Sequence, residues 1–258
     1  MQATTNPKMQ KNRNFKQVQV INRAAAILRT VRLSGDITLS QLARQVGLAR
    51  TTVYRIVATL ESEGLLTTTP NGKIQLGIEL IPLGAAVQTD VRRELRPYLE
   101  ELSMKLDETV DLSVRDRDHV LFIDQIVRLH RLHAVSGVGV EFPLHSTANG
   151  KALLSMCTMD ELISLIPENL PIYTPNTIKT RQQLLRELET VRLDGVAFDR
   201  EEHTLGICAV GAVVHAPMDT IAAITIPVPS IRFYGNEEKL VTSLVQACRT
   251  INGRYHLG

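Results

Sequence analysis

One stretch of about 60 residues, from Val18 to Leu76, constrains the fold more than any other part of the chain. Apolar residues recur in it at helical spacing three times, and a glycine ends or interrupts each run. An Asn-Gly turn between two β-branched or alternating runs then predicts a hairpin. We expect helices over residues 18–34, 41–46 and 50–63 and a hairpin over residues 65–76. Three helices followed by a hairpin is the order of a winged helix-turn-helix.

The charge of the chain is unevenly divided. Residues 1–77 carry eleven Lys and Arg side chains against three Asp and Glu, a net charge of +8, and the remaining residues carry 18 against 24, a net charge of −6. A basic segment attached to an acidic body points to a polyanionic partner for the first part only. The alternative is a solvated basic tail, which accounts only for the basic residues of positions 8–16. Residues 1–15 offer little apolar surface, and we expect them to be disordered.

A helix-turn-helix places its second helix in the major groove of DNA, where the first residues of that helix reach the base edges. In this chain that helix begins near Arg50, and its two arginines can contact guanine edges or phosphates. Lys73, at the tip of the wing, is placed to touch phosphate or the minor groove, and Tyr54 fits either packing or a phosphate contact. The alternative is a helical hairpin that binds another protein. The residues that we predict to contact DNA are Thr38, Arg50, Thr51, Thr52, Tyr54, Arg55 and Lys73.

Beyond residue 77 the pattern becomes mixed. Residues 78–90 predict a helix that connects two domains, and residues 91–106 predict a helix that is kinked or restarted at Pro97. After it we expect strands and helices together, with a hairpin turn at residues 116–118. The predicted strands are residues 109–114, 119–126, 132–135, 209–215 and 221–226, and the predicted helices are residues 150–156, 160–166, 180–194 and 236–253.

Several classes of protein are excluded by composition. No run approaches the roughly 18 consecutive apolar residues of a membrane span, and the first residues lack the apolar core of a signal peptide. We therefore expect a cytoplasmic protein with no membrane partner. Cys157, Cys208 and Cys248 are odd in number and form no CxxC pair, which indicates free thiols rather than a disulfide or a zinc site. We predict neither a metal nor a cofactor.

A polar loop leads into a helix near the middle of the chain. Ser146, Thr147 and Asn149 precede Gly150-Lys151 and an apolar run. Free N–H groups and the positive end of a helix dipole suit a carboxylate at such a place, and the alternative is an ordinary capped helix start. A nucleotide-phosphate loop is not indicated, because the earlier glycine of that motif is missing and alanine follows the lysine.

A second polar cluster comprises Asp199, Glu201, Glu202 and His203. Acidic pairs with a histidine can serve acid–base catalysis or metal binding, and the alternative is a solvated turn after the helix of residues 180–194. A hypothesis of a different class is a hydrolase or transferase. Because the chain contains no recognisable GxSxG or HExxH motif, we expect no catalytic residues. That enzyme would use His145, Asp199 and His203 with Cys157 or Cys208.

Four blocks of the sequence resemble the IclR family of transcriptional regulators. They are VQVINRA with Ile27-Leu28, LSQLARQVGL with TVYRI, PLHSTANGKALL, and FDREEH through Gly206, in that family's order. The resemblance implies an α+β protein with an N-terminal winged helix-turn-helix, a linker helix and a C-terminal GAF-like α/β effector domain with an antiparallel sheet. The implied division is a disordered basic tail of residues 1–15, a DNA-binding domain of residues 16–77, a linker helix of residues 78–90 and an effector-binding domain of residues 91–258.

The resemblance also implies a ligand-responsive regulator rather than an enzyme. Regulators of this kind are usually homodimers or dimers of dimers (homotetramers) on palindromic operators in double-stranded DNA. They respond to small organic acids, often aromatic ones. The positions that the resemblance implies for effector binding are Ala134, Ala148, Asn149, Asp199, Ala209, Thr225 and Pro227.

Some of these positions depart from the family's pattern. Ala209 stands where a cysteine is common, Asn149 occupies a position that is usually small, and Pro227-Val228 replace a more usual Ser-Gly. Since proline offers no N–H donor, we expect at least one polar ligand contact of the family to be absent here. The departures indicate an effector that is less polar or differently shaped.

Overall fold

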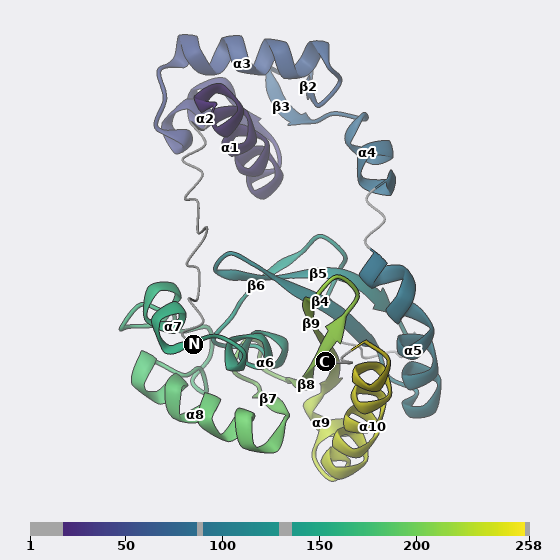
Figure 1. Ribbon diagram of the computed structural model, residues 1–258. Helices are drawn as coiled ribbons and strands as arrows, with labels where there is room; N and C mark the ends of the chain where they lie inside the picture. Colours follow the sequence, from purple (N-terminus) through teal and green to yellow (C-terminus); the bar gives the residue numbers. More distant parts are fainter. Residues whose placement is uncertain (1–17, 87–89, 129–135, 256–258) are drawn as a thin grey trace, which may run out of the picture. The chain divides into compact units, whose positions relative to one another are not determined.

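The computed structural model describes residues 18–86, 90–128 and 136–255. Contacts divide the chain into two compact units, residues 1–87 and residues 88–258, whose elements Figure 1 labels. The basic tail expected over residues 1–15 lies outside the described residues.

Helices and a small sheet make up the N-terminal unit (Figure 1). Its antiparallel sheet has the strand order β1-β3-β2. One apolar side of each of the first three helices packs with the sheet into a core that includes Ile27, Leu42, Val53 and Ile74. The predicted order of a winged helix-turn-helix is confirmed. The elements are α1 (Gln19–Ser34), β1 (Ile37–Thr38), α2 (Leu39–Val46), α3 (Arg50–Ser62), β2 (Leu66–Thr68), β3 (Lys73–Leu76) and α4 (Leu80–Ala86).

Capping explains where the second helix begins. Thr38 Oγ1 accepts a hydrogen bond from the backbone N–H of Gln41, and the Gln41 side chain accepts one from the backbone N–H of Thr38. Helix α2 therefore starts at Leu39, two residues before the start that periodicity predicts. Gly47 follows α2 in the left-handed region at φ 66°, which side chains with a Cβ rarely adopt, and turns the chain toward α3.

The C-terminal unit is built on a six-stranded antiparallel sheet with the order β6-β5-β4-β9-β8-β7 (Figure 1). The antiparallel sheet of the expected effector domain is confirmed. The strands are β4 (Val110–Asp116), β5 (His119–Ile126), β6 (Glu141–Pro143), β7 (Ala197–Arg200), β8 (Ile207–Ala216) and β9 (Thr220–Pro229). The helices are α5 (Asp90–Leu106), α6 (Ala148–Ser155), α7 (Met159–Leu165), α8 (Arg181–Asp194), α9 (Ser230–Phe233) and α10 (Glu237–Tyr255).

Two apolar cores lie on opposite faces of this sheet. Helices α5 and α10 pack on the face that includes Leu112, Ile224 and Ile226. Helices α6, α7 and α8 pack on the other face, with Ala223 of β9 among them. Successive side chains of a strand point to opposite faces. The same alternation therefore places Thr225 on the α6 face of the sheet.

Parts of the C-terminal unit differ from the sequence expectations. The hydrophobic pattern predicts neither β6 nor β7, because strands of three and four residues are too short to show an alternation. Helix α5 runs through Pro97 as one element instead of restarting there. The other predicted elements shift by a few residues at their ends. The strand expected over residues 132–135 lies outside the described residues.

Within residues 78–90, for which the sequence predicts a helix, the structure has α4 over Leu80–Ala86, and residues 87–89 lie outside the described residues. Pro82 lies in the first turn of α4, where no N–H donor is needed. Ile78 and Ile81 are 79% and 70% exposed, so this segment leaves apolar surface unburied within its unit. Among the described residues, no helix is long and apolar enough to cross a membrane.

Candidate functional site

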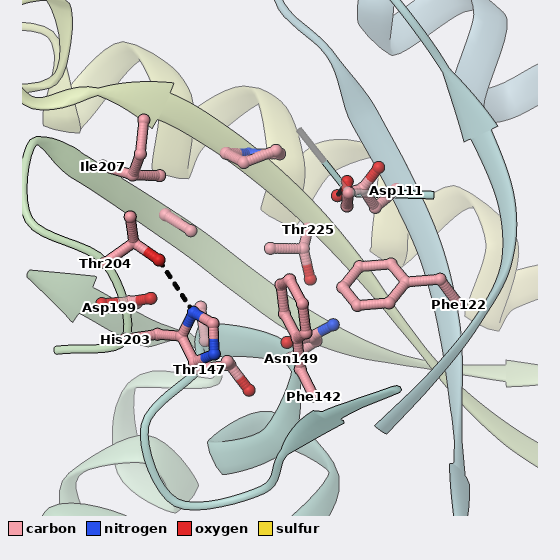
Figure 2. A pocket seen from close by; sticks show the side chains of 14 residues that line it. Asp111, Phe122, Phe142, Thr147, Asn149, Asp199, His203, Thr204, Ile207 and Thr225 are labelled. Atoms are coloured by element: carbon pink, nitrogen blue, oxygen red, sulfur yellow. Dashed lines mark hydrogen bonds between the residues drawn. The ribbon is translucent and has the colours of Figure 1, made fainter. Parts of the chain in front are cut away.

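A cavity of about 290 Å³ lies between the α6 face of the sheet and the start of α6. Figure 2 shows the side chains that surround it. Because all six strands contribute, the cavity exists only once the whole sheet is assembled. The contributing residues are Asp111 of β4, Phe122 of β5, Phe142 of β6, Asp199 of β7, Ile207 and Ala209 of β8, and Thr225 and Pro227 of β9.

Most of the positions that the resemblance implied for effector binding meet at this cavity. The structure brings six of the seven together: Ala148, Asn149, Asp199, Ala209, Thr225 and Pro227. The seventh, Ala134, lies outside the described residues.

The sequence analysis singled out none of six other lining residues: Asp111, Phe122, Ser136, Phe142, Thr204 and Ile207. Asp111 faces Thr225 across the register of β4 and β9, so the two side chains share one face of the sheet. The sequence gives no signal for its burial, because apolar and polar residues alternate along β4 and such a pattern places Asp111 on a solvent-exposed face. The two phenylalanines carry no signal for the cavity either, since an aromatic residue in a strand is usually part of the core.

The start of α6 is fixed tightly against its surroundings. Thr147 Oγ1 accepts a hydrogen bond from the Gly150 N–H at 3.3 Å and donates one to the Pro143 carbonyl at 2.9 Å. The Asn149 side chain donates to Ser113 Oγ at 3.1 Å and accepts from the Gly150 N–H at 3.1 Å. A Cβ at Gly150 would lie 2.2 Å from the carbonyl oxygen of Leu144, so only glycine fits there.

Two buried carboxyl groups lie in the lining (Figure 2). Asp111 accepts hydrogen bonds from Gln125 Nε2 at 2.7 Å and Ser136 Oγ at 2.6 Å, and burial raises its pKa to about 6. Asp199 Oδ1 accepts a hydrogen bond from the Glu202 N–H at 2.7 Å, and burial raises its pKa to about 7. Both carboxyl groups therefore change charge close to neutral pH.

Thr225 presents an unsatisfied hydroxyl to the cavity. Among the described residues its Oγ1 has no hydrogen-bond partner, although only 4% of the residue is exposed. A buried polar group without a partner costs about 1–3 kcal/mol. In the lining of a cavity, such a group indicates a site that a bound molecule completes.

Aromatic rings form one wall of the cavity. Phe142 stacks on His203 with ring centroids 4.4 Å apart, and Phe122 meets Phe142 edge to face at 5.1 Å. His203 Nδ1 lies 2.9 Å from Thr204 Oγ1, the hydrogen bond drawn in Figure 2. Burial lowers the pKa of His203, which favours its neutral form. Such walls suit a flat ring.

Lys151 stabilises the segment from Asp199 in β7 to His203 in the loop that follows. This lysine is fully buried, and its Nζ donates to Glu202 Oε1 at 2.6 Å and to Glu187 Oε1 at 3.2 Å. Glu202 in turn holds Asp199 through its backbone N–H. The alternative of a solvated turn is wrong for Asp199 and Glu202, since both are buried.

The groups named for a hydrolase do not form a catalytic centre in the described part of the chain. His145 Nε2 is bonded to the Pro171 carbonyl at 2.9 Å. Cys157 and Cys208 are buried, and burial raises the pKa of both thiols, which disfavours the nucleophilic thiolate. In the described ranges no group of three His, Cys, Asp or Glu side chains could hold a metal ion.

On the N-terminal unit, α3 presents one polar face to solvent. Arg50, Thr51, Tyr54 and Arg55 are exposed along it, and Thr52 is half-buried. The opposite face of the helix lies in the core. As far as the described residues show, neither Arg50 nor Arg55 is ion-paired, so both guanidinium groups are available to phosphates or guanine edges.

Thr38 and Lys73 are neighbours in the small sheet, paired in register between β1 and β3. The Thr38 hydroxyl is already engaged in the cap of α2, 2.7 Å from Gln41 Oε1. Lys73 is half-buried and is the first residue of β3. The expectation that Lys73 lies at the tip of the wing is wrong, because the turn is made earlier, by the Gly72 N–H donating to the Thr69 carbonyl.

Comparison with known proteins extends these observations over nearly the whole chain. Residues 83–252 match the family described as bacterial transcriptional regulator IclR C-terminal, and residues 20–70 match the IclR helix-turn-helix domain. The HTH-type transcriptional regulator Rv1719 of Mycobacterium tuberculosis is 45% identical over 230 residues, which cover 88% of this chain and 89% of the relative.

Solved structures are similar as well. The IclR transcriptional regulator of Alicyclobacillus acidocaldarius has a TM-score of 0.79 at 27% identity, covering 92% of this chain and 98% of that one. An IclR homolog of Microbacterium hydrocarbonoxydans, crystallised in complex with 4-hydroxybenzoate, has a TM-score of 0.76 at 21% identity, covering 92% and 99%. The second likeness is one of fold alone.

Proposed function

The chain belongs to the IclR family of bacterial transcriptional regulators, and from this we propose that it binds a palindromic operator through α3 and responds to a small organic effector in its C-terminal cavity. The relatives are transcriptional regulators, not enzymes. We assign DNA binding to residues 16–77, connection to residues 78–90 and effector binding to residues 91–258.

The exposed arginines of α3, which form no ion pair with any other described residue, carry the DNA-binding part of the proposal. An α-helix fits the major groove of B-DNA, and arginine is the residue that most often reads guanine there. We propose that the central contacts with the DNA are made by Arg50, Thr51, Tyr54 and Arg55. Thr52, Thr38 and Lys73 would contact it from the edges of this face.

The effector part rests on the cavity and on its Thr225 hydroxyl, which finds no hydrogen-bond partner in the described part of the chain. The resemblance implies a small organic acid, aromatic acids included, and 4-hydroxybenzoate in the Microbacterium homolog is such a compound. The mechanism is differential affinity, in which the effector favours one arrangement of the two units and that arrangement fits the operator better or worse.

We further propose that the active form is a homodimer or a dimer of dimers. A palindromic operator presents two half-sites, and a two-fold symmetric protein places one recognition helix in each. The exposed Ile78, just before α4, and Ile81, within it, offer apolar surface for such an interface. Light scattering of the full chain with and without operator DNA measures the mass; a monomer in both would contradict this part.

The DNA proposal is tested by fluorescence anisotropy on a labelled duplex from the region upstream of the chain's own gene. Binding should weaken as salt increases, because phosphate contacts release counterions. The double variant Arg50→Ala/Arg55→Ala should lose roughly tenfold to a hundredfold in affinity and lower the salt slope by about 2. The control Arg186→Ala removes an exposed arginine from α8 and should change neither.

Two results would contradict DNA binding through α3. One is an affinity that does not depend on salt. The other is a double variant that binds the duplex as well as the unchanged protein, which would favour the alternative of a helical hairpin that contacts another protein.

A further inference from the structure

Three side-chain hydrogen-bond donors of the cavity lining are already engaged within the protein. The Asn149 amide donates to Ser113, the Thr147 hydroxyl donates to the Pro143 carbonyl, and the Ser136 hydroxyl donates to Asp111. A molecule that enters the cavity therefore meets few free donors among these side chains.

Acceptors, by contrast, are in surplus. A carboxylate accepts up to about four hydrogen bonds. Asp111 takes two from side chains, and Asp199 takes backbone N–H groups of Glu202 and His203. Each carboxylate thus keeps lone pairs free, and the Thr225 hydroxyl beside them is unpartnered within the described residues. The entering molecule therefore has to bring donors for the two carboxylates, while the Thr225 hydroxyl can either donate or accept.

The charge of the lining points the same way. Two carboxyl groups line the cavity, and no lysine or arginine does so among the described residues. Lys151 is the buried cation close to Asp199, and Glu202 and Glu187 already pair with it. The histidines nearby, His145 and His203, have pKa values lowered by burial and stay neutral at neutral pH. A carboxylate ligand would meet two like charges without a partner, which is costly in a buried site.

The two carboxyl groups stand at opposite sides of the cavity. Asp111 lies on β4 and Asp199 on β7, and β9 and β8 separate these strands in the sheet. Figure 2 shows them on opposite sides with Thr225 between, and with the rings of Phe122 and Phe142 beside the space. A flat ring with a donor at each end matches this arrangement.

We propose that the cavity binds an uncharged single-ring aromatic compound that carries hydroxyl groups at both ends, rather than an aromatic carboxylate. The volume of about 290 Å³ lies at the small end of ligand pockets, which suits one ring. This inference rests on the proposed function, because it takes the cavity as the effector site, and it replaces the acid that the family resemblance implies with a hydroxyl compound.

The test is a calorimetric titration of the full chain with two matched probes, 4-hydroxybenzyl alcohol and 4-hydroxybenzoate, which differ only at one end of the ring. At about pH 8, where both aspartates are charged, the alcohol should bind at least about tenfold more tightly. At about pH 5.5 the difference should shrink, because the aspartates take up protons and no longer repel the acid.

Asp199→Asn keeps the shape of the side chain and removes its charge. At about pH 8 this variant should bind the acid more tightly and the alcohol more weakly than the unchanged protein, by several-fold each. Asp111→Asn repeats the test at the other end of the cavity. The control is Asp118→Asn, on the exposed turn between β4 and β5, which should leave both affinities unchanged.

The results separate the inference from the proposed function. If the acid binds more tightly than the alcohol at about pH 8, or if neither probe binds, the hydroxyl inference is overturned. Operator binding is measured separately, in the salt-dependent anisotropy experiment. The proposed function as a regulator therefore remains valid in either case. Loss of operator binding with intact binding of the alcohol would instead sink the proposed function.

Discussion

Asp199 is the side chain in the cavity whose ionisation is most finely balanced. Burial and the nearby charge of Glu202 favour its neutral form, whereas the Glu202 N–H and Lys151 favour the charged form. Burial is the largest influence and raises the pKa from 3.8 to about 7. Because the folded state then holds this proton more tightly than the unfolded chain, stability falls as pH rises between these two values and stays reduced above them.

We therefore predict that Asp199→Asn stabilises the protein relative to the unchanged chain, and increasingly so from about pH 4 to about pH 7, by up to about 4 kcal/mol. The Asn oxygen can still accept the Glu202 N–H. Thermal melts across this range measure the difference, in which the similar titration of Asp111 cancels. A difference that is the same at both ends of the range would contradict the burial argument.

Lys151 supplies a second prediction at this scale. Replacing it with Met leaves Glu202 as a buried, unpaired carboxylate, which should lower the free energy of unfolding by about 3–5 kcal/mol. Glu187, the outer partner, has a side chain that is 38% exposed, and Glu187→Gln should cost under about 1 kcal/mol. Urea unfolding of both variants tests the ranking. Equal losses of unfolding free energy in the two variants would mean that water reaches Glu202.

At the scale of elements, the packing of the start of α6 against the sheet determines the shape of the cavity. The helix starts where Thr147 caps it, and two glycines allow close approach: Gly150 beside Leu144, and Gly211 of β8 beside the backbone of Ala148. A Cβ at Gly211 would lie 3.0 Å from that backbone. The sheet and the helix therefore touch through main chain, which brings Ala148 and Asn149 to the cavity.

Gly150→Ala should displace the start of α6, because its Cβ would clash with the Leu144 carbonyl. We expect a loss of about 1–3 kcal/mol in stability and a clear loss of affinity for 4-hydroxybenzyl alcohol. The matched control is Gly253→Ala in α10, where a Cβ meets nothing within 4 Å. It should gain up to about 1 kcal/mol from helix propensity. A Gly150 variant as stable as the unchanged protein would mean that α6 moves without cost.

The whole molecule consists of two separately packed units, and the function that we propose requires communication between them. A change of affinity at one site by the ligand of the other is a coupling free energy, and it is reciprocal. The coupling requires that the effector bind the two arrangements of the protein unequally. An effector that binds both arrangements with equal affinity does not change operator affinity, however tightly it binds.

We predict that whatever factor an effector imposes on operator affinity, the operator imposes on effector affinity, within the range of about 5- to 150-fold. Anisotropy with and without 4-hydroxybenzyl alcohol gives the first factor, and calorimetry with and without operator duplex gives the second. A scrambled duplex of the same length is the control. Two factors that disagree would show that the alcohol and the operator are not linked through one equilibrium.

Elements whose signals lie close together in the chain could be predicted from the residues alone. The helical spacing, the glycine after α2 and the Asn-Gly hairpin predict the winged helix-turn-helix, because each depends on residues close together in the chain. The exposed side chains of α3 follow from the same spacing. Four sequence blocks sufficed to indicate the family and, through it, six residues that line the cavity.

The lining of the cavity, in contrast, depends on the assembled fold. It takes side chains from all six strands, and the pairing of Asp111 with Thr225 joins residues more than a hundred positions apart. No local pattern records such a pairing. Burial then set the ionisation of Asp111 and Asp199, since desolvation depends on every atom around a carboxyl group and not on its neighbours in sequence.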